Sequence, residues 1–383
     1  MNASSMHSPP PSSAGPHGFG RLQSLAHLLA PARVRESFAL SPSPPLRNAA
    51  VAGLQVCAAV SIAVTLAHVS PWSHLEGFPA LGALAALFGR FAPGGQRMRI
   101  VGLAALLLVL SVALPSLAAL AGAPPSVLLL CLAALAGLLT VAVTRWRIGG
   151  PGAVIFVFAA SAALGPVHDW HTLAGRTAFT AMGAALAWLV CRMTDGLRTD
   201  TPAPAPAGGP PRPAGHWLVV ALRTAACAGA AALLAHAAGL PFPAWAAIGT
   251  TAVLQGGHLH ITMHRAVQRM VGTVLGAGIA GLILSSHPSF LTVLLAVVLL
   301  QFLTEMVIGF NYGFGLIAVT PMALLMTSLA APGAADVMPF ARVLDTGLGA
   351  LAGIAFALVF SSLDDRAYLA AHHARGRAQA QAG

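Results

Sequence analysis

Apolar stretches of about twenty residues follow one another along most of this chain, and only short segments interrupt them. Of its 383 residues, 57% are hydrophobic and only 8% are charged, whereas a soluble domain has about 25% charged residues. So little charge does not cover the surface of a soluble protein of this size. Because a helix needs about 20 apolar residues to cross a bilayer, the sequence predicts an all-α integral membrane protein with about twelve transmembrane helices.

Short motifs recur in the two halves of the chain at a nearly constant offset. The matched motifs are Arg176-x-x-x-Thr180-x-x-Gly183 with Arg342-x-x-x-Thr346-x-x-Gly349, Arg99-x-x-Gly102 with Arg269-x-x-Gly272, and Phe78-Pro79-Ala80 with Phe242-Pro243-Ala244. Their offsets are 166, 170 and 164 residues. We interpret the chain as a duplication whose second half keeps more of the polar residues. Six segments in each half give both halves the same orientation, so we expect two parallel six-helix repeats.

The expected segments define the domain organisation. Those of the first half are 47–69, 75–91, 99–121, 126–144, 150–167 and 173–193, and those of the second are 217–239, 242–257, 266–285, 289–309, 311–331 and 340–360. We expect a disordered N-terminal region with an interfacial helix over 1–46, a first membrane repeat over 47–195, a Pro-rich cytoplasmic linker over 196–216, a second repeat over 217–361 and a cytoplasmic tail over 362–383.

The charge pattern predicts the orientation in the membrane. All twenty basic residues are arginine, and most of them lie in the tails and in alternate short loops. Cytoplasmic loops carry an excess of basic residues, so we expect a multi-pass protein of the bacterial inner membrane with both termini in the cytoplasm. The net charge of +10 then reflects topology, and no nucleic-acid partner is expected because basic and aromatic residues are not interleaved.

Arg342 and Asp345 stand three residues apart at the start of the last apolar segment. On a helix they share a face, and charged groups in hydrocarbon cost roughly 2.5–3.5 kcal/mol each on insertion scales, so we expect them to face the interior and to be paired. Gly349 and Gly353 behind them allow another helix to approach closely. Asp345 is therefore a candidate proton-coupling residue, and the alternative is a purely structural pair with Arg342.

Other polar residues lie near the second segment of each half, which is short and begins with proline. Paired short or broken segments indicate a transporter's binding site, although a tilted helix with proline in its first turn has the same pattern. Trp245 and Gln255 belong to the second of these segments, and Tyr312 begins segment eleven. Glu305 is a second candidate for proton coupling, either as a proton carrier or as the partner of an arginine. The alternative is an acid near the cytoplasmic interface.

Several chemistries are not supported by any motif. His258, His260 and His264 lie close together after segment eight and invite a metal site, but solvated loop histidines explain them without one, and no metal is predicted. The four cysteines form no Cys-x-x-Cys pair. Catalytic motifs and a Walker motif are missing, the latter because the chain has no lysine. We expect neither an enzyme nor a cofactor.

Two ordered motifs of the second half resemble the signature of the fusaric acid resistance (FUSC-like) family. They are Arg265-Ala-Val-Gln-Arg269-Met-Val-Gly272-Thr273-Val-Leu-Gly276 and Arg342-Val-Leu-Asp345-Thr346-Gly-Leu-Gly349. The Pro-Ala-Trp245 start of segment eight and the later Gln255 are similar to that family too. The resemblance is good from about Leu218 to Phe360 and weaker from Arg47 to Arg192.

This resemblance implies an inner-membrane exporter of aromatic carboxylic acids that is driven by the proton gradient. The residues that carry over by motif position are Arg269, Thr273, Gly276, Arg342, Asp345 and Thr346. Longer relatives have soluble domains between and after the halves, and this chain has only the linker and a short tail there. By resemblance alone, a periplasmic adaptor protein and a second copy of the chain are candidate partners.

The residues are consistent with such an activity on physical grounds. Arginine offers a planar fork that matches a carboxylate, and we assign substrate binding to Arg342, Thr346, Arg269, Thr273, Trp245, Gln255 and Tyr312. Asp345 or Glu305 then carries the proton. A passive anion channel on a similar scaffold is the alternative, and a third interpretation is a membrane protein that transports nothing.

Overall fold

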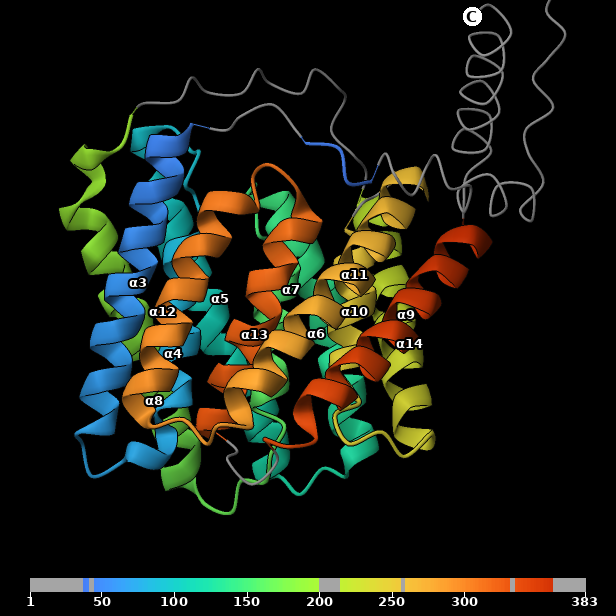
Figure 1. The fold of residues 1–383 in the computed structure, drawn as a ribbon. Coiled ribbons are helices and arrows are strands. Elements are labelled where there is room, and N and C mark those ends of the chain that lie inside the picture. The colour runs from blue at the N-terminus through green and yellow to red at the C-terminus, as the bar shows by residue number, and fades with distance from the viewer. Residues whose placement is uncertain (1–36, 41–44, 200–213, 256–258, 331–334, 361–383) are drawn as a thin grey trace, which may run out of the picture.

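The computed structural model describes residues 37–40, 45–199, 214–255, 259–330 and 335–360 (Figure 1). The helices in these ranges are α3 (Leu46–His68), α4 (Gly77–Ala83), α5 (Gly94–Leu120), α6 (Pro125–Arg145), α7 (Ala153–Ala162), α8 (Trp170–Met193), α9 (Ala214–Ala237), α10 (Ala244–Leu254), α11 (Leu259–Leu284), α12 (Phe290–Val307), α13 (Tyr312–Ala330) and α14 (Met338–Val359). Three 3₁₀ turns join them: η1 (Ser73–Leu75), η2 (Leu84–Leu87) and η3 (Asp195–Leu197). No strand occurs in these ranges, which confirms the all-α class.

Nine of the described helices are long and apolar enough to cross a membrane. Three shorter apolar helices, Gly77–Leu87, Ala153–Ala162 and Ala244–Leu254, complete the twelve expected segments. The fifth helix is shorter than expected, because α7 has ten residues and the apolar run predicts a helix over 150–167. Gly149 and Gly152 adopt positive φ before α7, and Gly165-Pro166 follows it, so helix is excluded at both ends of the run.

Local signals in the sequence explain several helix starts. The Asp169 carboxylate accepts a hydrogen bond of 2.7 Å from the backbone N–H of Thr172 and caps α8. Ser289 caps α12 in the same way through Thr292 N–H, at 3.3 Å. Pro125 opens α6, where its missing N–H costs nothing because the first turn has no intrahelical acceptor.

The two halves pack against each other in a reciprocal way, as a duplication predicts. The fourth helix of each half packs on the first helix of the other, so α6 contacts α9 and α12 contacts α3. In the same manner α7 contacts α10 and α13 contacts α4. α3 begins and α14 ends at the upper face in Figure 1. We call this face the arginine-rich end, because Arg47 at the start of α3 donates to the Leu197 carbonyl oxygen at 2.9 Å, and the adjacent Arg198 donates to that of Arg90.

The short helices α4 and α10 occupy the interior, and every residue of both is buried. Each packs on the last helix of its own half at a glycine. A Cβ on Gly183 of α8 would lie 2.0 Å from the Pro79 carbonyl oxygen, and one on Gly349 of α14 would lie 2.3 Å from that of Ala246. No side chain fits at either position, so these glycines set the distance between the helices.

These contacts correct the register of the repeat. Pro79 occupies the place of Ala246, so Phe78 corresponds to Trp245 and not to Phe242. The offset for the short helices is therefore 167 residues rather than 164, which agrees better with the 166 of the closing helices.

The predicted linker is wider than the structure supports. Asp195–Leu197 forms η3, the backbone N–H of Thr199 donates to the Asn48 side chain at 2.9 Å, and α9 begins at Ala214. Near the N-terminus, Asn311 donates to the carbonyl oxygens of Ser37 and Ala39 at 3.0 and 3.1 Å. The predicted interfacial helix, except its end, and the tail over 362–383 lie outside the described residues.

Candidate functional site

A cavity of about 280 Å³ lies between the two halves, and we call it the central cavity. Its polar lining includes Arg90, Arg265, Arg269, Gln301, Thr304, Glu305, Tyr312 and Arg342. Apolar walls come from α7, η2 and α13. The lining on α13 runs from Tyr312 to Ala323, which corresponds to roughly 16 Å along a helix. The central cavity therefore extends from the arginine-rich end deep into the membrane region.

Arg265 and Arg269 present their guanidinium groups to Tyr312. The two arginines are four residues apart on α11 and therefore share one face. Arg269 Nη1 donates to the Tyr312 hydroxyl at 3.2 Å, and Arg265 Cζ lies 5.0 Å from the centroid of the Tyr312 ring. The Tyr312 hydroxyl thus accepts a hydrogen bond from one guanidinium, and the Tyr312 ring stacks with the other. Both arginine side chains are oriented by a tyrosine rather than by a carboxylate.

Arg342 enters the central cavity from the first turns of α14. Its Cζ lies 5.0 Å from the centroid of the Trp245 ring. The side chain is buried, and its Nε has no hydrogen-bond partner. Among the described residues, no carboxylate lies within salt-bridge distance of Arg342. A buried guanidinium with unfilled donors is a binding site for an anion.

The equivalent arginine of the first half has a different environment. Arg176 lies over the Phe78 ring at 5.4 Å, but its guanidinium donates to the carbonyl oxygens that follow α7, those of Ala163, Gly165 and Pro166 at 3.4, 3.1 and 2.9 Å. Arg176 thus caps the C-terminal end of α7. The duplicated position is structural in the first half and faces the central cavity in the second.

Asp345 does not form the pair with Arg342 that the sequence predicts. It is fully buried, and neither carboxylate oxygen has a hydrogen-bond partner within the described ranges. Although the two residues share a helical face, the arginine side chain extends to Trp245 and the central cavity. The hydroxyl of Thr346 is also buried without a partner, and Thr273 is buried on α11. Asp345, Thr346 and Thr273 lie outside the lining of the central cavity.

Glu305 forms a salt bridge with Arg90, in which Nη1 donates to Oε2 at 2.7 Å. Arg90 follows η2 of the first half and Glu305 ends α12 of the second, so the bridge joins the halves. The Glu305 side chain is 6% exposed, so this acid is buried within the protein. The sequence leaves Glu305 either as a proton carrier or as the partner of an arginine, and the structure shows it paired with Arg90.

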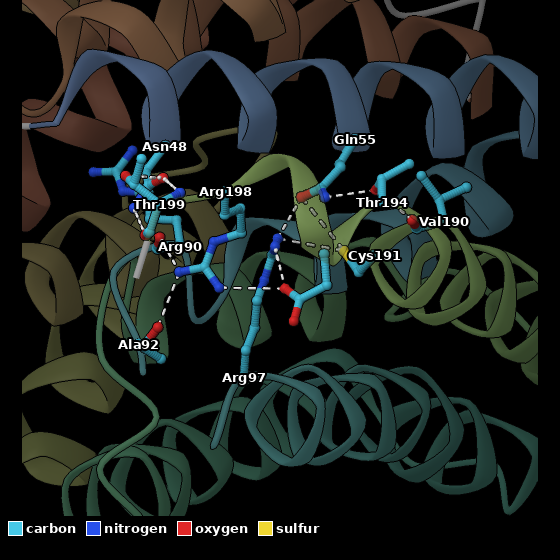
Figure 2. Close-up of polar contacts among 11 residues, drawn as sticks. Asn48, Gln55, Arg90, Ala92, Arg97, Val190, Cys191, Thr194, Arg198 and Thr199 are labelled. Carbon is cyan, nitrogen blue, oxygen red and sulfur yellow. Dashed lines mark hydrogen bonds and ion pairs between the residues drawn. The ribbon is translucent and has the colours of Figure 1, made fainter. Parts of the chain in front are cut away.

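A second polar network holds Arg90 in place (Figure 2). Arg198 donates to the carbonyl oxygens of Arg90 and Ala92 at 2.7 and 2.9 Å. Arg198 also shares the carboxylate of Asp195 with fully buried Arg97, at 3.3 and 3.2 Å. Burial lowers the pKa of the Arg198 guanidinium, and the neighbouring charge of Arg97 lowers it further. Arg99, whose motif the sequence matches to that of Arg269, is exposed.

Gln255 lies away from the central cavity and lines a second, larger one. With its amide oxygen turned toward the start of α7, it accepts hydrogen bonds from the backbone N–H groups of Ala153 and Val154, at 2.8 and 2.9 Å. Gln255 is therefore a cap for α7 rather than a residue of the central cavity.

The histidines after α10 do not form the loop that the sequence predicts. His260 and His264 lie in the first turns of α11, because this helix begins at Leu259, and His258 lies outside the described residues. In the ranges that the structure describes, no group of three or more His, Cys, Asp or Glu side chains could hold a metal ion.

Part of the second half is similar to a known family. Residues 230–356 match the family model described as fusaric acid resistance protein-like. They hold Trp245, Arg269, Tyr312 and Arg342, so this family segment contributes most of the charged lining of the central cavity, and Arg90 from the first half completes it.

One curated relative of this chain is the uncharacterized membrane protein YvaC of Bacillus subtilis (strain 168). It is 34% identical over 138 residues, which cover 36% of this chain and 22% of the relative. The aligned part thus spans about a fifth of the relative's length. No solved structure matches the chain.

Sequence reasoning missed two arginines of the central cavity. Arg265 falls just before the expected segment 266–285 and Arg90 at the end of the segment 75–91, and neither was assigned a role in binding. The spacing of four residues between Arg265 and Arg269 was the signal for the first, because it places both on one face of a helix. Nothing in the sequence indicates that Arg90 reaches Glu305, since 215 residues separate them.

Proposed function

We propose that this protein is a secondary active exporter of aromatic carboxylic acids or similar organic anions, driven by the proton gradient across the bacterial inner membrane. The observation that carries the proposal is that Arg265, Arg269 and Arg342 line one cavity. None of the three has a carboxylate within salt-bridge distance among the described residues. Three cations without a salt bridge at one site favour an anion over a neutral or cationic solute.

The other walls of the central cavity favour an aromatic body on that anion. Phe158, Leu316 and the ring of Tyr312 line it, and Trp245 lies just behind Arg342. Small-molecule sites are mostly apolar with a few polar groups that fix orientation. A volume of about 280 Å³ admits a single-ring acid and excludes a large amphiphile.

Asp345 supports the proton-coupling part of the proposal. It lies one helical turn from Arg342, is fully buried, and has no donor for its carboxylate. In this mechanism the protonated acid leaves Arg342 free to hold the anion. Loss of the proton creates a charge that attracts Arg342 and weakens its hold on the substrate, so substrate and proton move in opposite directions. Glu305 remains a second candidate, through its bridge to Arg90.

The test is export from proteoliposomes under an imposed pH gradient. Native protein should export a labelled aromatic acid in proportion to the gradient. Asp345→Asn should bind the acid but lose the dependence on the gradient. A gradient dependence equal to that of the native protein would remove Asp345 from the mechanism.

A passive anion channel is the second candidate, because the arginines of the central cavity form a continuous cationic wall for an anion. Electrical recordings on reconstituted protein separate the two. An ohmic anion current that is independent of protons favours the channel, and its absence together with coupled export favours the exporter.

Orientation and partners are part of the proposal. The arginine-rich end faces the cytoplasm by the excess of basic residues there, so both termini are cytoplasmic. A periplasmic adaptor protein or a second copy of the chain would bind outside the central cavity. A screen of aromatic acids for toxicity in cells that lack the protein, or that produce Arg342→Ala, identifies the substrate.

A further inference from the structure

A second cavity of about 720 Å³ opens at the arginine-rich end, and we call it the vestibule. It lies between the end of α6, the start of α9 and the end of α10, next to the turn that leads into α7. α6 and α10 end there and α9 begins there. The vestibule therefore opens on the side of the membrane at which α3 begins and α14 ends.

The vestibule is lined by cations. Arg147, Arg223 and Arg265 contribute to its wall, and no carboxylate does so among the described residues. Arg223 is half-buried, and its Nε is inaccessible and has no hydrogen-bond partner. A guanidinium with unfilled, desolvated donors at the wall of a cavity is ready to bind an oxyanion.

Arg147 adopts a backbone conformation that its residue type does not favour. It follows the C-cap of α6 with a φ of 52°, at the position where helices usually end in glycine. The turn is closed by a hydrogen bond from Ile148 N–H to the Val143 carbonyl oxygen, at 3.0 Å. Glycine would occupy this position without strain. An arginine there indicates that its side chain serves a purpose in the vestibule.

The vestibule also has an aromatic wall and hydroxyl groups. Trp217 lines it, with the His216 ring edge-on at 5.3 Å between centroids. Threonines from three helices line it as well: Thr140 and Thr144 of α6, Thr224 of α9 and Thr251 of α10. Thr140, Thr144 and Thr251 donate their hydroxyls to carbonyl oxygens of their own helices, at 2.7, 2.7 and 2.8 Å. The guanidinium groups and the indole ring therefore carry the match, which fits an aromatic carboxylate better than a metal ion or a neutral solute.

The vestibule and the central cavity share part of their walls. Arg265, Gly150 and Pro151 line both. Beside this shared wall, Gln255 holds the start of α7 through its bonds to Ala153 and Val154. The shared wall is therefore the partition between the two cavities, and Arg265 can contact an anion on either side of it.

We infer that the vestibule is a second binding site for organic anions, where substrate is captured before it passes Arg265 into the central cavity. The choice of ligand rests on the proposed function, whereas the site itself rests on the lining described above. An anionic phospholipid headgroup shares the chemistry of such a ligand, and the experiment distinguishes the two sources.

Two tryptophans serve as reporters, because Trp217 lies in the vestibule and Trp245 beside Arg342. The experiment titrates benzoate into the full chain in nanodiscs of zwitterionic lipid and follows tryptophan fluorescence. Trp217→Phe and Trp245→Phe identify the contribution of each reporter. Arg223→Gln should weaken the Trp217 response about tenfold, as for the loss of one charge-assisted hydrogen bond, and leave the Trp245 response unchanged. Arg145→Gln is the matched control, since Arg145 is exposed and lies outside the vestibule lining.

The outcomes separate this inference from the proposed function. Saturable responses at both tryptophans, with the Trp217 response unaffected when anionic lipid is added, support the inference. A response at Trp245 alone overturns the inference and leaves the proposed function standing. Loss of the Trp217 response in anionic lipid also overturns it, because the headgroup then occupies the vestibule. No response at either tryptophan contradicts the proposed function itself.

Discussion

The guanidinium of Arg342 lies over the indole ring of Trp245, with 5.0 Å between Cζ and the ring centroid. The first half repeats the contact between Arg176 and Phe78 at 5.4 Å. The Arg176 guanidinium donates hydrogen bonds to the carbonyl oxygens after α7, whereas Arg342 lines the central cavity. The duplicated contact therefore has a structural role in the first half and places a buried cation at the central cavity in the second.

This difference predicts opposite phenotypes for the two arginines. Arg342→Gln should weaken anion binding about 10- to 100-fold, as expected for the loss of a charge-assisted hydrogen bond, with little change in thermal stability. Arg176→Gln should lower stability by about 1 kcal/mol, because it removes hydrogen bonds to partly buried carbonyl groups, and should preserve affinity. Thermal unfolding in detergent and benzoate binding, measured on both variants, check the pair. Equal effects on both measurements would remove the proposed division of roles.

The salt bridge between Arg90 and Glu305 should stabilise the contact between the halves. Breaking a buried pair by removing one partner costs about 3–5 kcal/mol, because the other charge is left uncompensated. We therefore expect Glu305→Gln and Arg90→Gln each to unfold at a clearly lower temperature. The double variant should be more stable than the sum of the two losses predicts. Additive losses in unfolding experiments on all three would show that the two side chains do not interact.

Gly349 should tolerate no side chain, because a Cβ there would lie 2.3 Å from the Ala246 carbonyl oxygen. Gly349→Ala should destabilise the protein by roughly 1–3 kcal/mol, as overpacking does. Gly347, two residues away on the same helix, is the control, since its Cβ would meet only the flexible end of Met270 at 3.5 Å. The yield and unfolding temperature of purified protein should fall for Gly349→Ala and remain near native for Gly347→Ala.

The cap of α8 should give stability a dependence on acid pH. Hydrogen bonds from Thr172, first of all its backbone N–H, lower the pKa of the Asp169 carboxyl below its ordinary 3.8. Because the folded pKa is the lower one, the cap contributes fully above the ordinary value and its contribution is lost as pH falls through the folded pKa. Asp169→Asn retains the cap and should remove this part of the pH dependence. An unchanged acid limb in unfolding experiments at a series of pH values would contradict it.

The sequence predicted the membrane class, the number of segments and the duplication, because these depend on apolar length and on motif spacing. It also identified Arg269, Tyr312, Glu305 and Arg342, four residues that line the central cavity. Charges inside an apolar run are few, so each is conspicuous. The second-half motifs were matched correctly to their family, which the comparison confirms.

The misassignments have physical causes. Arg342 and Asp345 were paired by helical spacing alone, but spacing does not specify where a long side chain extends, and the Arg342 guanidinium lies over Trp245 and lines the central cavity. Arg90 and Arg97 were given no role, because only the folded chain brings them to Glu305 and Asp195. Gln255 was assigned to substrate binding, whereas its side chain accepts hydrogen bonds from backbone N–H groups at the start of α7.

The central claim is that the arginines of the central cavity hold an organic anion. It is tested most directly by calorimetric titration of benzoate into purified protein in zwitterionic nanodiscs. We expect saturable binding to the native chain and to the double control Arg99→Gln/Arg145→Gln, whose arginines are exposed, and an affinity more than about tenfold weaker for Arg269→Gln/Arg342→Gln. Equal affinity for the two double variants would contradict the account.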